Sequence, residues 1–485
     1  MASLDELLHE IRRIEESRVT LTEKRIMSIY KSLEKDLSAF IADEYVKYAD
    51  KDGKLFLTYL GKNKRAKFLE EIVKNVDSIS PQVKRELIDL VNKTYEKSFK
   101  GISSAVKKAD DTKDLLKGVN TLVPPEVLNR AVRNNIDKLT LNAVMEKHRA
   151  EIIADIQQTL TTGLMNGERY ETMAKRIQER LGVSYSKASN IARTEAHRNT
   201  ESGLMDGAKE TAKIIDKDGG LIYAATWRTM GDQRVRPQQR RKTKKGWVTT
   251  ISKNGANHVK MNGVTVKVGE KFQLEPDVFA ECPGMSGTAR NDCRCRCFLR
   301  YRLMTPQEFY KATGRNITLT EEQVEAVKDY TGIYGKDINA YMNGKTSELS
   351  DKGEMLIDVL HNTLGKTIVE SGGVLYRGSS LGVFGSKEKS VLSNPQSAVG
   401  MTLTNKGFMS LTSDIKVAKT FSSPNYGKLI LYEMDVPQGA KGLDLSKLSI
   451  FDYEKETLLQ DHTSFTVTGV VEDDEKIVFK CAVLK

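Results

Sequence analysis

Cysteine is scarce in this sequence, and the few cysteines are unevenly placed. Only 5 of the 485 residues are cysteine, and four of these lie between Cys282 and Cys297. This distribution does not resemble the disulfide framework of a small secreted protein, in which cysteines are numerous and spread along the chain. In a reducing compartment we therefore expect thiols or a metal site.

Long apolar runs are also missing. No segment approaches the roughly 18 apolar residues of a membrane-spanning helix, so we expect no membrane partner. Charges occupy the N-terminal segment Leu4–Glu10, where a signal peptide has its apolar region, and this predicts no export by that route.

The rest of the composition is ordinary for a large globular protein, with 39% hydrophobic and 29% charged residues. A chain of this length is too long for one core, so we expect about two to four domains. The net charge of +11 indicates tolerance of polyanionic partners.

The hydrophobic pattern divides the chain into three parts. Residues 1–120 show apolar residues at helical spacing and predict a helical N-terminal arm. Pro124-Pro125 interrupts the pattern and predicts a joint. Residues 121–304 predict a module that is helical to about residue 215 and β-rich afterwards. Residues 305–485 predict a compact domain with helices first and strands after, so the expected fold class is multidomain α+β.

Two local patterns make this outline more definite. Val264, Val266 and Val268 alternate with other residues, which predicts a half-buried strand. Thr320 begins a capping-box sequence, which predicts a helix that starts at Glu321.

Three short segments in the middle of the chain occur in a recognisable order. They are Arg193-Thr194-Glu195, then Asp232-Gln233-Arg234-Val235-Arg236, and then Asn291-Asp292-Cys293-Arg294-Cys295. Together they resemble the phage Mu F-like minor head proteins, so residues 121–304 are expected to form such a module. The resemblance implies phage portal and capsid proteins as partners and a place in the procapsid or virion interior.

This sequence departs from that family in the position of its histidine. Gln238-Gln239 stand where the family has the histidine, and His258 looks like the displaced match. Residues 237–257 are therefore interpreted as an insertion.

The cysteine cluster could hold zinc. Thiolate and imidazole are the ligands that structural zinc prefers. The candidates are Cys282, Cys293, Cys295, Cys297 and His258. Their spacing is less regular than paired Cys-x-x-Cys motifs, so ordinary reduced cysteines and a buried, hydrogen-bonded His258 remain the alternative.

The segment Arg234–Lys245 carries seven basic residues in twelve and no acid. It could contact packaged DNA or an acidic portal surface. Because no aromatic residues are interleaved, a solvated loop is an equally good interpretation.

The C-terminal part contains the clearest chemistry. Arg377 lies in an apparent strand, and a guanidinium there can pair with the phosphate oxygens of a dinucleotide. Ser410 and Thr412 are two apart on another apparent strand and share a face. Glu454 and Glu456 are also two apart and are expected to share a face of an extended segment. A fixed carboxylate can stabilise the oxocarbenium-like state in which an N-glycosidic bond breaks, and a second can deprotonate the nucleophile.

This constellation resembles the Arg/Ser/Glu class of mono-ADP-ribosyltransferases, the toxin-like exoenzymes, over about residues 318–485. The resemblance implies NAD⁺ as substrate and a split β-sandwich core. It makes Arg377 the NAD-binding arginine, Ser410 the first residue of the Ser-Thr-Ser strand and Glu456 the catalytic glutamate. Glu454 would be the upstream glutamate, which in the family accompanies arginine acceptors.

The same resemblance assigns four further residues. It places Thr412 and Asn339 at the nucleotide, and it places Phe451 and Tyr453 in the loop that recognises the acceptor. The family's Ser-Thr-Ser is here Ser410-Leu411-Thr412, which keeps both outer hydroxyls.

The combined prediction is a phage minor head protein that carries an NAD-dependent protein-arginine ADP-ribosyltransferase. The enzyme would act on a host protein in the host cytoplasm after delivery with the DNA. Two alternatives remain: a purely structural head protein with a degenerate C-terminal domain, and an NAD glycohydrolase.

Overall fold

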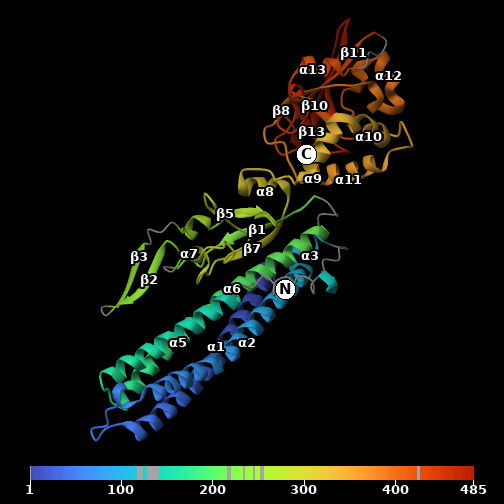
Figure 1. Ribbon diagram of the computed structural model, residues 1–485. Coiled ribbons are helices and arrows are strands. Elements are labelled where there is room, and N and C mark those ends of the chain that lie inside the picture. The colour runs from blue at the N-terminus through green and yellow to red at the C-terminus, as the bar shows by residue number, and fades with distance from the viewer. Residues whose placement is uncertain are drawn as a thin grey trace. The chain divides into compact units, whose positions relative to one another are not determined.

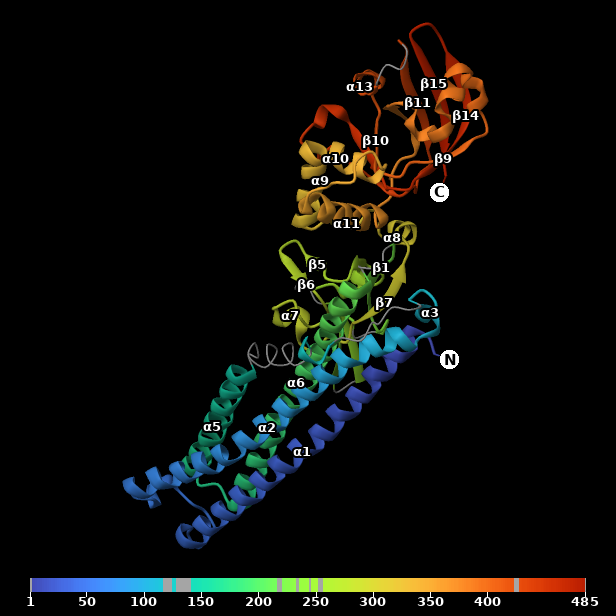
Figure 2. The same cartoon turned by 90° about the vertical axis from the view of Figure 1, so that its right-hand side faces the viewer.

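The computed structural model describes residues 2–116, 124–127, 141–215, 220–232, 235–243, 246–251, 256–422 and 427–484. The chain divides into two compact units, which are described separately (Figures 1 and 2). Unit 1 comprises Met1–Thr211, Thr226–Val264 and Lys271–Tyr301, and unit 2 comprises Ala212–Ala225, Thr265–Glu270 and Arg302–Lys485. Among the described helices, none is both long enough and apolar enough to span a bilayer.

Long helices dominate unit 1, as predicted. They are α1 (Leu4–Tyr48), α2 (Lys62–Lys108), α5 (Leu141–Met165) and α6 (Tyr170–Ile215), with the short α3 (Asp110–Lys113) and the 3₁₀ turn η1 (Leu57–Tyr59). The predicted joint at Pro124-Pro125 borders residues outside the described ranges, because only residues 124–127 are described there.

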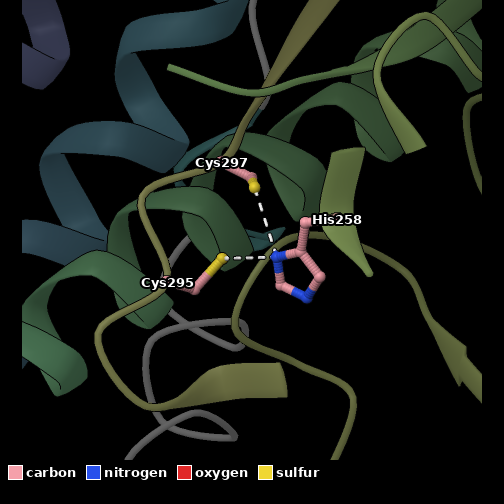
Figure 3. Close-up of side chains that lie close together, drawn as sticks. All are labelled: His258, Cys295 and Cys297. Atoms are coloured by element: carbon pink, nitrogen blue, oxygen red, sulfur yellow. Dashed lines mark hydrogen bonds between the residues drawn. The ribbon is translucent and has the colours of Figure 1, made fainter. Parts of the chain in front are cut away.

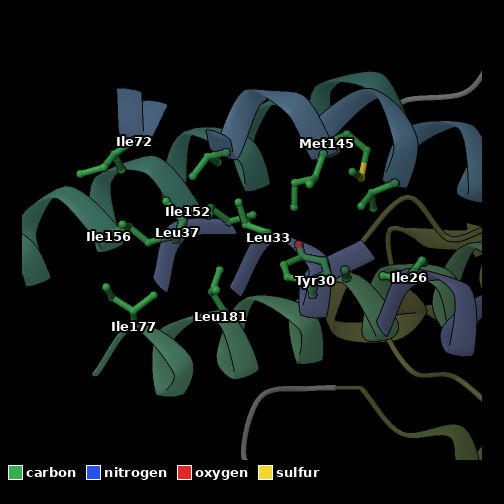
Figure 4. Packing of buried hydrophobic residues seen from close by; sticks show 14 of the residues in the cluster. Ile26, Tyr30, Leu33, Leu37, Ile72, Met145, Ile152, Ile156, Ile177 and Leu181 are labelled. Atoms are coloured by element: carbon green, nitrogen blue, oxygen red, sulfur yellow. The ribbon is translucent and has the colours of Figure 1, made fainter. Parts of the chain in front are cut away.

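The four long helices share one apolar core, of which Figure 4 shows the central part. Leu33 and Leu37 of α1 lie there among Ile72 of α2, Ile152 of α5 and Ile177 of α6. These residues are at most 4% exposed. The amphipathic pattern therefore produces a helix bundle because each helix buries its apolar stripe against the others.

Glycine allows a close contact between helices α6 and α2 in this bundle. A Cβ on Gly203 of α6 would lie 2.6 Å from the Tyr95 carbonyl of α2, and one on Gly207 would lie 2.5 Å from the Phe99 carbonyl. The two glycines therefore let α6 pack against the backbone of α2.

Short strands and turns follow α6. They are β1 (Ile222–Arg228), β2 (Gln238–Thr243), β3 (Gly246–Ile251), η2 (His258–Met261), β4 (Thr265–Lys267), β5 (Phe272–Glu275), β6 (Val278–Ala280), α7 (Ala289–Asp292) and β7 (Phe298–Met304). The strands pair as β4-β1-β7, as the hairpin β2-β3 and as the hairpin β5-β6. The predicted strand at Val264–Val268 is confirmed only as the short β4, and Val264 is 37% exposed.

Most of unit 2 is an α+β fold, as predicted. Its helices and helical turns are α8 (Pro306–Thr313), α9 (Glu321–Asp329), the π-helical η3 (Tyr330–Tyr334), α10 (Gly335–Met342), α11 (Asp351–Gly365), η4 (Leu381–Lys387), α12 (Glu388–Ser393), η5 (Pro395–Ala398), α13 (Ile415–Thr420) and η6 (Asp452–Glu454). Its strands after β7 are β8 (Gly373–Gly378), β9 (Thr402–Thr404), β10 (Met409–Thr412), β11 (Leu429–Val436), β12 (Gly442–Asp444), β13 (Glu456–Leu459), β14 (Ser464–Glu472) and β15 (Lys476–Val483). The predicted helix start at Glu321 is confirmed, with Thr320 and Gln323 forming the capping box.

These strands form one sheet in the order β12-β13-β10-β8-β11-β15-β14-β9. Strands β10 and β8 meet at the register pair Thr412–Tyr376, so a three-stranded part adjoins a five-stranded part there. The strand pairing gives one continuous sheet. The split β-sandwich core therefore stays a prediction.

The two faces of β13 and its neighbours serve different cores. Leu458 and Phe408 pack with α9, α10 and α11, whereas Leu459 and Met409 belong to the core under β11 and β15. Figure 2 shows the three helices gathered on one side of this unit. Because successive side chains on a strand point to opposite faces, Glu456 and its register partner Thr412 share the face of Leu458.

Candidate active site and a buried thiol–histidine cluster

Arg377 occupies the centre of the large sheet. It lies on β8 opposite Tyr432 of β11, and its Nη1 atom is buried without a hydrogen-bond partner in the described residues. Burial lowers the pKa of Arg377, and a guanidinium nevertheless stays charged in proteins. A buried guanidinium whose Nη1 still has hydrogen bonds to donate is suited to binding an anionic ligand.

The backbone after Arg377 is closely packed. A Cβ on Gly378 would lie 1.9 Å from the carbonyl oxygen of Ala418 in α13. Because Gly378 has no Cβ, helix α13 can pack against the backbone of β8 directly beside Arg377.

Ser410 and Glu456 lie on neighbouring antiparallel strands. The register pairs Thr412 with Glu456 and Ser410 with Leu458. Glu456 is 7% exposed, and burial raises the pKa of its carboxyl. The adjacent Ser410 hydroxyl opposes this rise in the pKa, and the charge of Glu454 adds to it. The structure therefore brings Ser410, Glu454 and Glu456 together.

The two glutamates do not share one extended segment, so that expectation was wrong. Glu454 ends the 3₁₀ turn η6, whereas Glu456 begins β13. Lys455 between them has φ +47°, which is a left-handed backbone conformation. The chain thus turns between the two carboxylates, and Glu454 remains partly exposed while Glu456 is buried.

Tyr330 is a site residue to which the sequence assigned no role. Its hydroxyl accepts a 2.7 Å hydrogen bond from Asn339 Nδ2. Burial raises the pKa of Tyr330 to about 12, with a further rise from Glu456. Ser410 and Arg377 lie close enough to lower the same pKa. Tyr330 therefore stands at the centre of the predicted residues.

Helical periodicity could not have paired Tyr330 with Asn339. Nine residues place two side chains on opposite faces of a regular α-helix. The segment Tyr330–Tyr334 is instead a π-helix, whose wider turn changes the phase before α10 begins. Asn339 Oδ1 remains buried and unpaired in the described structure.

Phe451 and Tyr453 lie beside the glutamates, in and before η6. Their rings meet edge to face with centroids 5.9 Å apart, and Tyr453 is 64% exposed. Phe451 is half-buried, so the Tyr453 ring is the part of this pair that is available to a protein partner.

A second group of functional side chains lies in unit 1. Both Cys295 Sγ and Cys297 Sγ point at Nδ1 of His258, at 3.6 Å and 3.3 Å (Figure 3). All three residues are buried. Hydrogen bonding by the Cys297 thiol and by the nearby histidines lowers the pKa of Cys295.

The other two candidate ligands do not join this group. Cys293 is exposed, and Arg294 with φ +54° turns the chain between it and Cys295. Cys282 is buried, and burial together with the charges of Glu201 and neighbouring acids raises the pKa of its thiol. Among the described residues, only His258, Cys295 and Cys297 form a compact set of metal-ligating groups.

Two different protein-family models match the regions that contain these two sites. A family model described as phage Mu protein F-like matches residues 154–300, and one described as ADP-ribosyltransferase exoenzyme matches residues 307–485. The chain joins a phage Mu F-like domain to an ADP-ribosyltransferase exoenzyme domain. Both resemblances seen in the sequence are thereby confirmed. We call residues 154–300 the head domain and residues 307–485 the transferase domain.

Two relatives have names that correspond to these two domains. The chain is 29% identical over 287 residues to minor head protein GP7 of Bacillus phage SPP1, covering 58% of this chain and 82% of the relative. It is 22% identical over 521 residues to the NAD(+)–arginine ADP-ribosyltransferase EFV of Enterococcus faecalis, covering 96% of this chain and 97% of the relative.

Solved structures similar to this chain include two ADP-ribosyltransferase toxins. Plx2a of Paenibacillus larvae is 20% identical and covers 34% of this chain and 88% of its own, with a TM-score of 0.29. The Vis toxin of Vibrio splendidus is 23% identical and covers 34% of this chain and 74% of its own, with a TM-score of 0.28.

The three sequence motifs of the head domain contact one another. Thr194 of the first motif accepts a 3.3 Å hydrogen bond from the backbone of Arg294 in the third. Asp232 of the second motif pairs with Arg296, which follows the third, at 2.5 Å. Motifs that are far apart in sequence thus meet around the thiol–histidine cluster.

Arg193 fixes the first motif to helix α1. Its guanidinium donates to both carboxylate oxygens of Glu23, at 2.7 Å and 2.6 Å. The same carboxylate accepts a hydrogen bond from the Ser189 hydroxyl of α6. A bidentate pair of this kind fixes geometry as well as charge, so this arginine has a structural role in joining α6 to α1.

The basic segment Arg234–Lys245 forms part of a hairpin where it is described. Residues 238–243 are strand β2, which pairs with β3 in antiparallel register. Arg234, Lys244 and Lys245 lie outside the described residues.

Proposed function

We propose that this protein is a minor head protein whose transferase domain moves ADP-ribose from NAD⁺ to an arginine of a host protein. The observation that supports the transfer most directly is the convergence of Arg377, Tyr330, Ser410 and Glu456 at one site of unit 2. The family match supplies NAD⁺ as the substrate class.

The residues present fit a dinucleotide. Arg377 offers a buried guanidinium nitrogen to a phosphate, and Asn339 offers a buried amide oxygen; neither atom has a partner among the residues that the structure describes. A Cβ on Gly407 would lie 2.3 Å from that oxygen, so the glycine keeps room at Asn339. Arg377 would bind the phosphates, and Asn339 and Ser410 would orient the nucleotide, while the predicted nucleotide contact Thr412 instead holds the Glu454 turn through its hydroxyl.

Glu456 would carry the bond-breaking step. The bond between ribose C1′ and the nicotinamide nitrogen breaks, and its electron pair leaves with nicotinamide. Positive charge then develops on the ribose, and the fixed carboxylate of Glu456 stabilises it. For this role Glu456 must be ionised, and the Ser410 hydroxyl favours that form.

Glu454 would serve the acceptor. A guanidine nitrogen of the acceptor arginine forms the new bond to C1′ and must lose a proton, which a carboxylate can accept. Glu454 is more exposed than Glu456, so an incoming side chain can reach it. Phe451 and the exposed Tyr453 would contact the protein around that arginine. The Enterococcus faecalis relative, an arginine-specific transferase by name, supports this acceptor.

The head domain would place the protein at the portal inside the procapsid, with capsid proteins as partners. The similarity to SPP1 GP7 supports a position in the virion. Delivery with the DNA would then bring the transferase domain into the host cytoplasm. The hairpin that carries Arg240 and Arg241 would contact packaged DNA through its basic sequence.

Labelled NAD⁺ incubated with the full chain and host lysate tests this function. We expect labelled protein and released nicotinamide, both absent with Glu456→Gln, and label on arginine by mass spectrometry. Nicotinamide release without labelled protein would identify a glycohydrolase. If neither product exceeded the Glu456→Gln background in any lysate, the protein would be a structural head protein.

A further inference from the structure

The buried cluster of the head domain has the dimensions of a metal site. Ligand atoms of His258, Cys295 and Cys297 lie within 4.8 Å of one another. In a tetrahedral zinc site, standard Zn–S and Zn–N bond lengths place sulfur and nitrogen about 3.6 Å apart. The two sulfurs lie 3.6 Å and 3.3 Å from His258 Nδ1.

A fourth ligand is available from helix α6. The Nε2 atom of His197 is buried and has no hydrogen-bond partner in the described residues. His197 lies in contact with Cys295, outside the 4.8 Å grouping of the other three side chains. Almost 100 residues separate His197 from the cysteines, so no local sequence pattern links them.

The surroundings of His258 also suit a metal ligand. Its other ring nitrogen, Nε2, lies 3.0 Å from Asn291 Oδ1. Asn291 is held in turn by hydrogen bonds from its Nδ2 to Glu275 at 3.0 Å and to Thr288 at 2.9 Å. An amide oxygen at Nε2 selects the tautomer in which Nδ1 carries a free lone pair toward the sulfurs. Trp227 closes another side, with its ring centroid 5.8 Å from that of His258.

Reduced thiols alone explain this arrangement less well. The single lone pair of Nδ1 can accept a hydrogen bond from one thiol, yet two sulfurs converge on it. The His197 Nε2 atom has no partner within the described part of the chain. One cation would satisfy all four groups.

We propose that Cys295, Cys297, His258 and His197 bind one Zn²⁺ ion in the head domain. Two thiols release their protons to solvent on binding, so two thiolates neutralise the ion and two imidazoles complete a tetrahedral set, the donor combination that selects zinc. The ion joins α6, η2 and the turn before β7. It holds the segments that carry the first and third head-domain motifs to the segment that carries His258. Cys282 and Cys293 take no part.

Metal analysis of the purified full chain tests the site. We expect one zinc per chain, and after exchange with Co²⁺ alone we expect the intense near-ultraviolet absorption of thiolate–cobalt bonds. Cys295→Ser and Cys297→Ser should remove that absorption, whereas Cys282→Ser and Cys293→Ser should retain it. A chain that contains no zinc and gains no such absorption with Co²⁺ overturns the proposal, as does loss of the absorption in Cys293→Ser.

X-ray absorption of the unmodified zinc protein covers the case in which the cysteine variants do not fold. Two sulfur and two nitrogen neighbours are expected, and a zinc with only oxygen and nitrogen neighbours contradicts the site. His197→Ala should weaken zinc binding at least about tenfold in competition with a chelator. Unchanged affinity would remove His197 from the ligand set. Metal binding and nicotinamide release are measured independently. Failure of the zinc proposal can therefore be distinguished from failure of the proposed transferase function.

Discussion

The hydroxyl of Thr412 donates a 2.6 Å hydrogen bond to the backbone carbonyl of Glu454. The Thr412 hydroxyl oxygen also accepts a 3.0 Å hydrogen bond from the backbone N–H of Asp414. Thr412 is also the register partner of Glu456. One side chain therefore links the Ser/Thr strand to the turn between the two glutamates, which explains why a hydroxyl suffices at this position.

We first predict that Thr412→Val impairs transfer more than cleavage of NAD⁺. Valine keeps the shape but leaves the Glu454 carbonyl and the Asp414 amide without their partner, which costs about 1–3 kcal/mol of unfolding free energy. The turn that positions Glu454 should loosen, while Glu456 keeps its place in β13. Labelled acceptor and nicotinamide release, measured side by side, check this. Thr412→Ser, which keeps the hydroxyl, should retain both, and equal loss of both products in Thr412→Val would contradict the idea.

Glu456→Gln should lower both nicotinamide release and protein labelling by about 10²–10³-fold, because the developing ribose charge loses its carboxylate. The folded-state pKa of Glu456 is raised, so its contribution to stability is lost as pH rises and the ionised form is costly at neutral pH. The variant should therefore unfold at a temperature no lower than the unmodified chain at about pH 7. A clear drop in the melting temperature would mean that activity is lost through misfolding instead.

Glu454→Gln should separate the two reactions. Labelling of arginine should fall about 10²–10⁴-fold as the base is lost, while nicotinamide release changes little. Removing the Glu454 charge also lowers the pKa of Glu456, so the acid limb of nicotinamide release should move to lower pH. A pH profile of nicotinamide release checks the direction. An acid limb that moves upward would show that the two carboxylates do not interact as described.

Two glycines of α6 should respond oppositely to alanine. Gly182 has nothing within 4 Å of an added Cβ, so Gly182→Ala should stabilise unit 1 by about 0.5–1 kcal/mol through helix propensity. In Gly207→Ala the Cβ meets the Phe99 carbonyl at 2.5 Å, and overpacking should destabilise by about 1–3 kcal/mol. Chemical denaturation of the full chain measures both. Similar effects from the two substitutions would refute the close α2–α6 contact.

Glu15 should make the stability of unit 1 depend on pH. It is 3% exposed in α1, and burial raises its pKa to about 7 despite Arg18. With a folded pKa above the unfolded one, its favourable contribution is present below about pH 4.5 and is lost as pH rises through 7. Glu15→Gln should therefore raise the melting temperature more at about pH 8 than at about pH 5. The exposed neighbour Glu16→Gln is the control and should show no such difference.

The sequence by itself determined the helical N-terminal region and the α+β C-terminal domain, and it supplied the residues proposed for the transferase site. These features depend on local signals, such as the capping box before Glu321, or on residue types in a fixed order, such as Arg377, Ser410 and Glu456. These features can be read from the sequence without knowing which distant segments pack together.

Only the tertiary structure decided how these residues face one another. The left-handed Lys455 separates Glu454 from Glu456, and the π-helix brings Tyr330 to Asn339. The contact of His197 with Cys295 depends on how α6 packs against a turn almost 100 residues later. Backbone strain and long-range packing arise from the whole fold, so no local pattern in the sequence could show them.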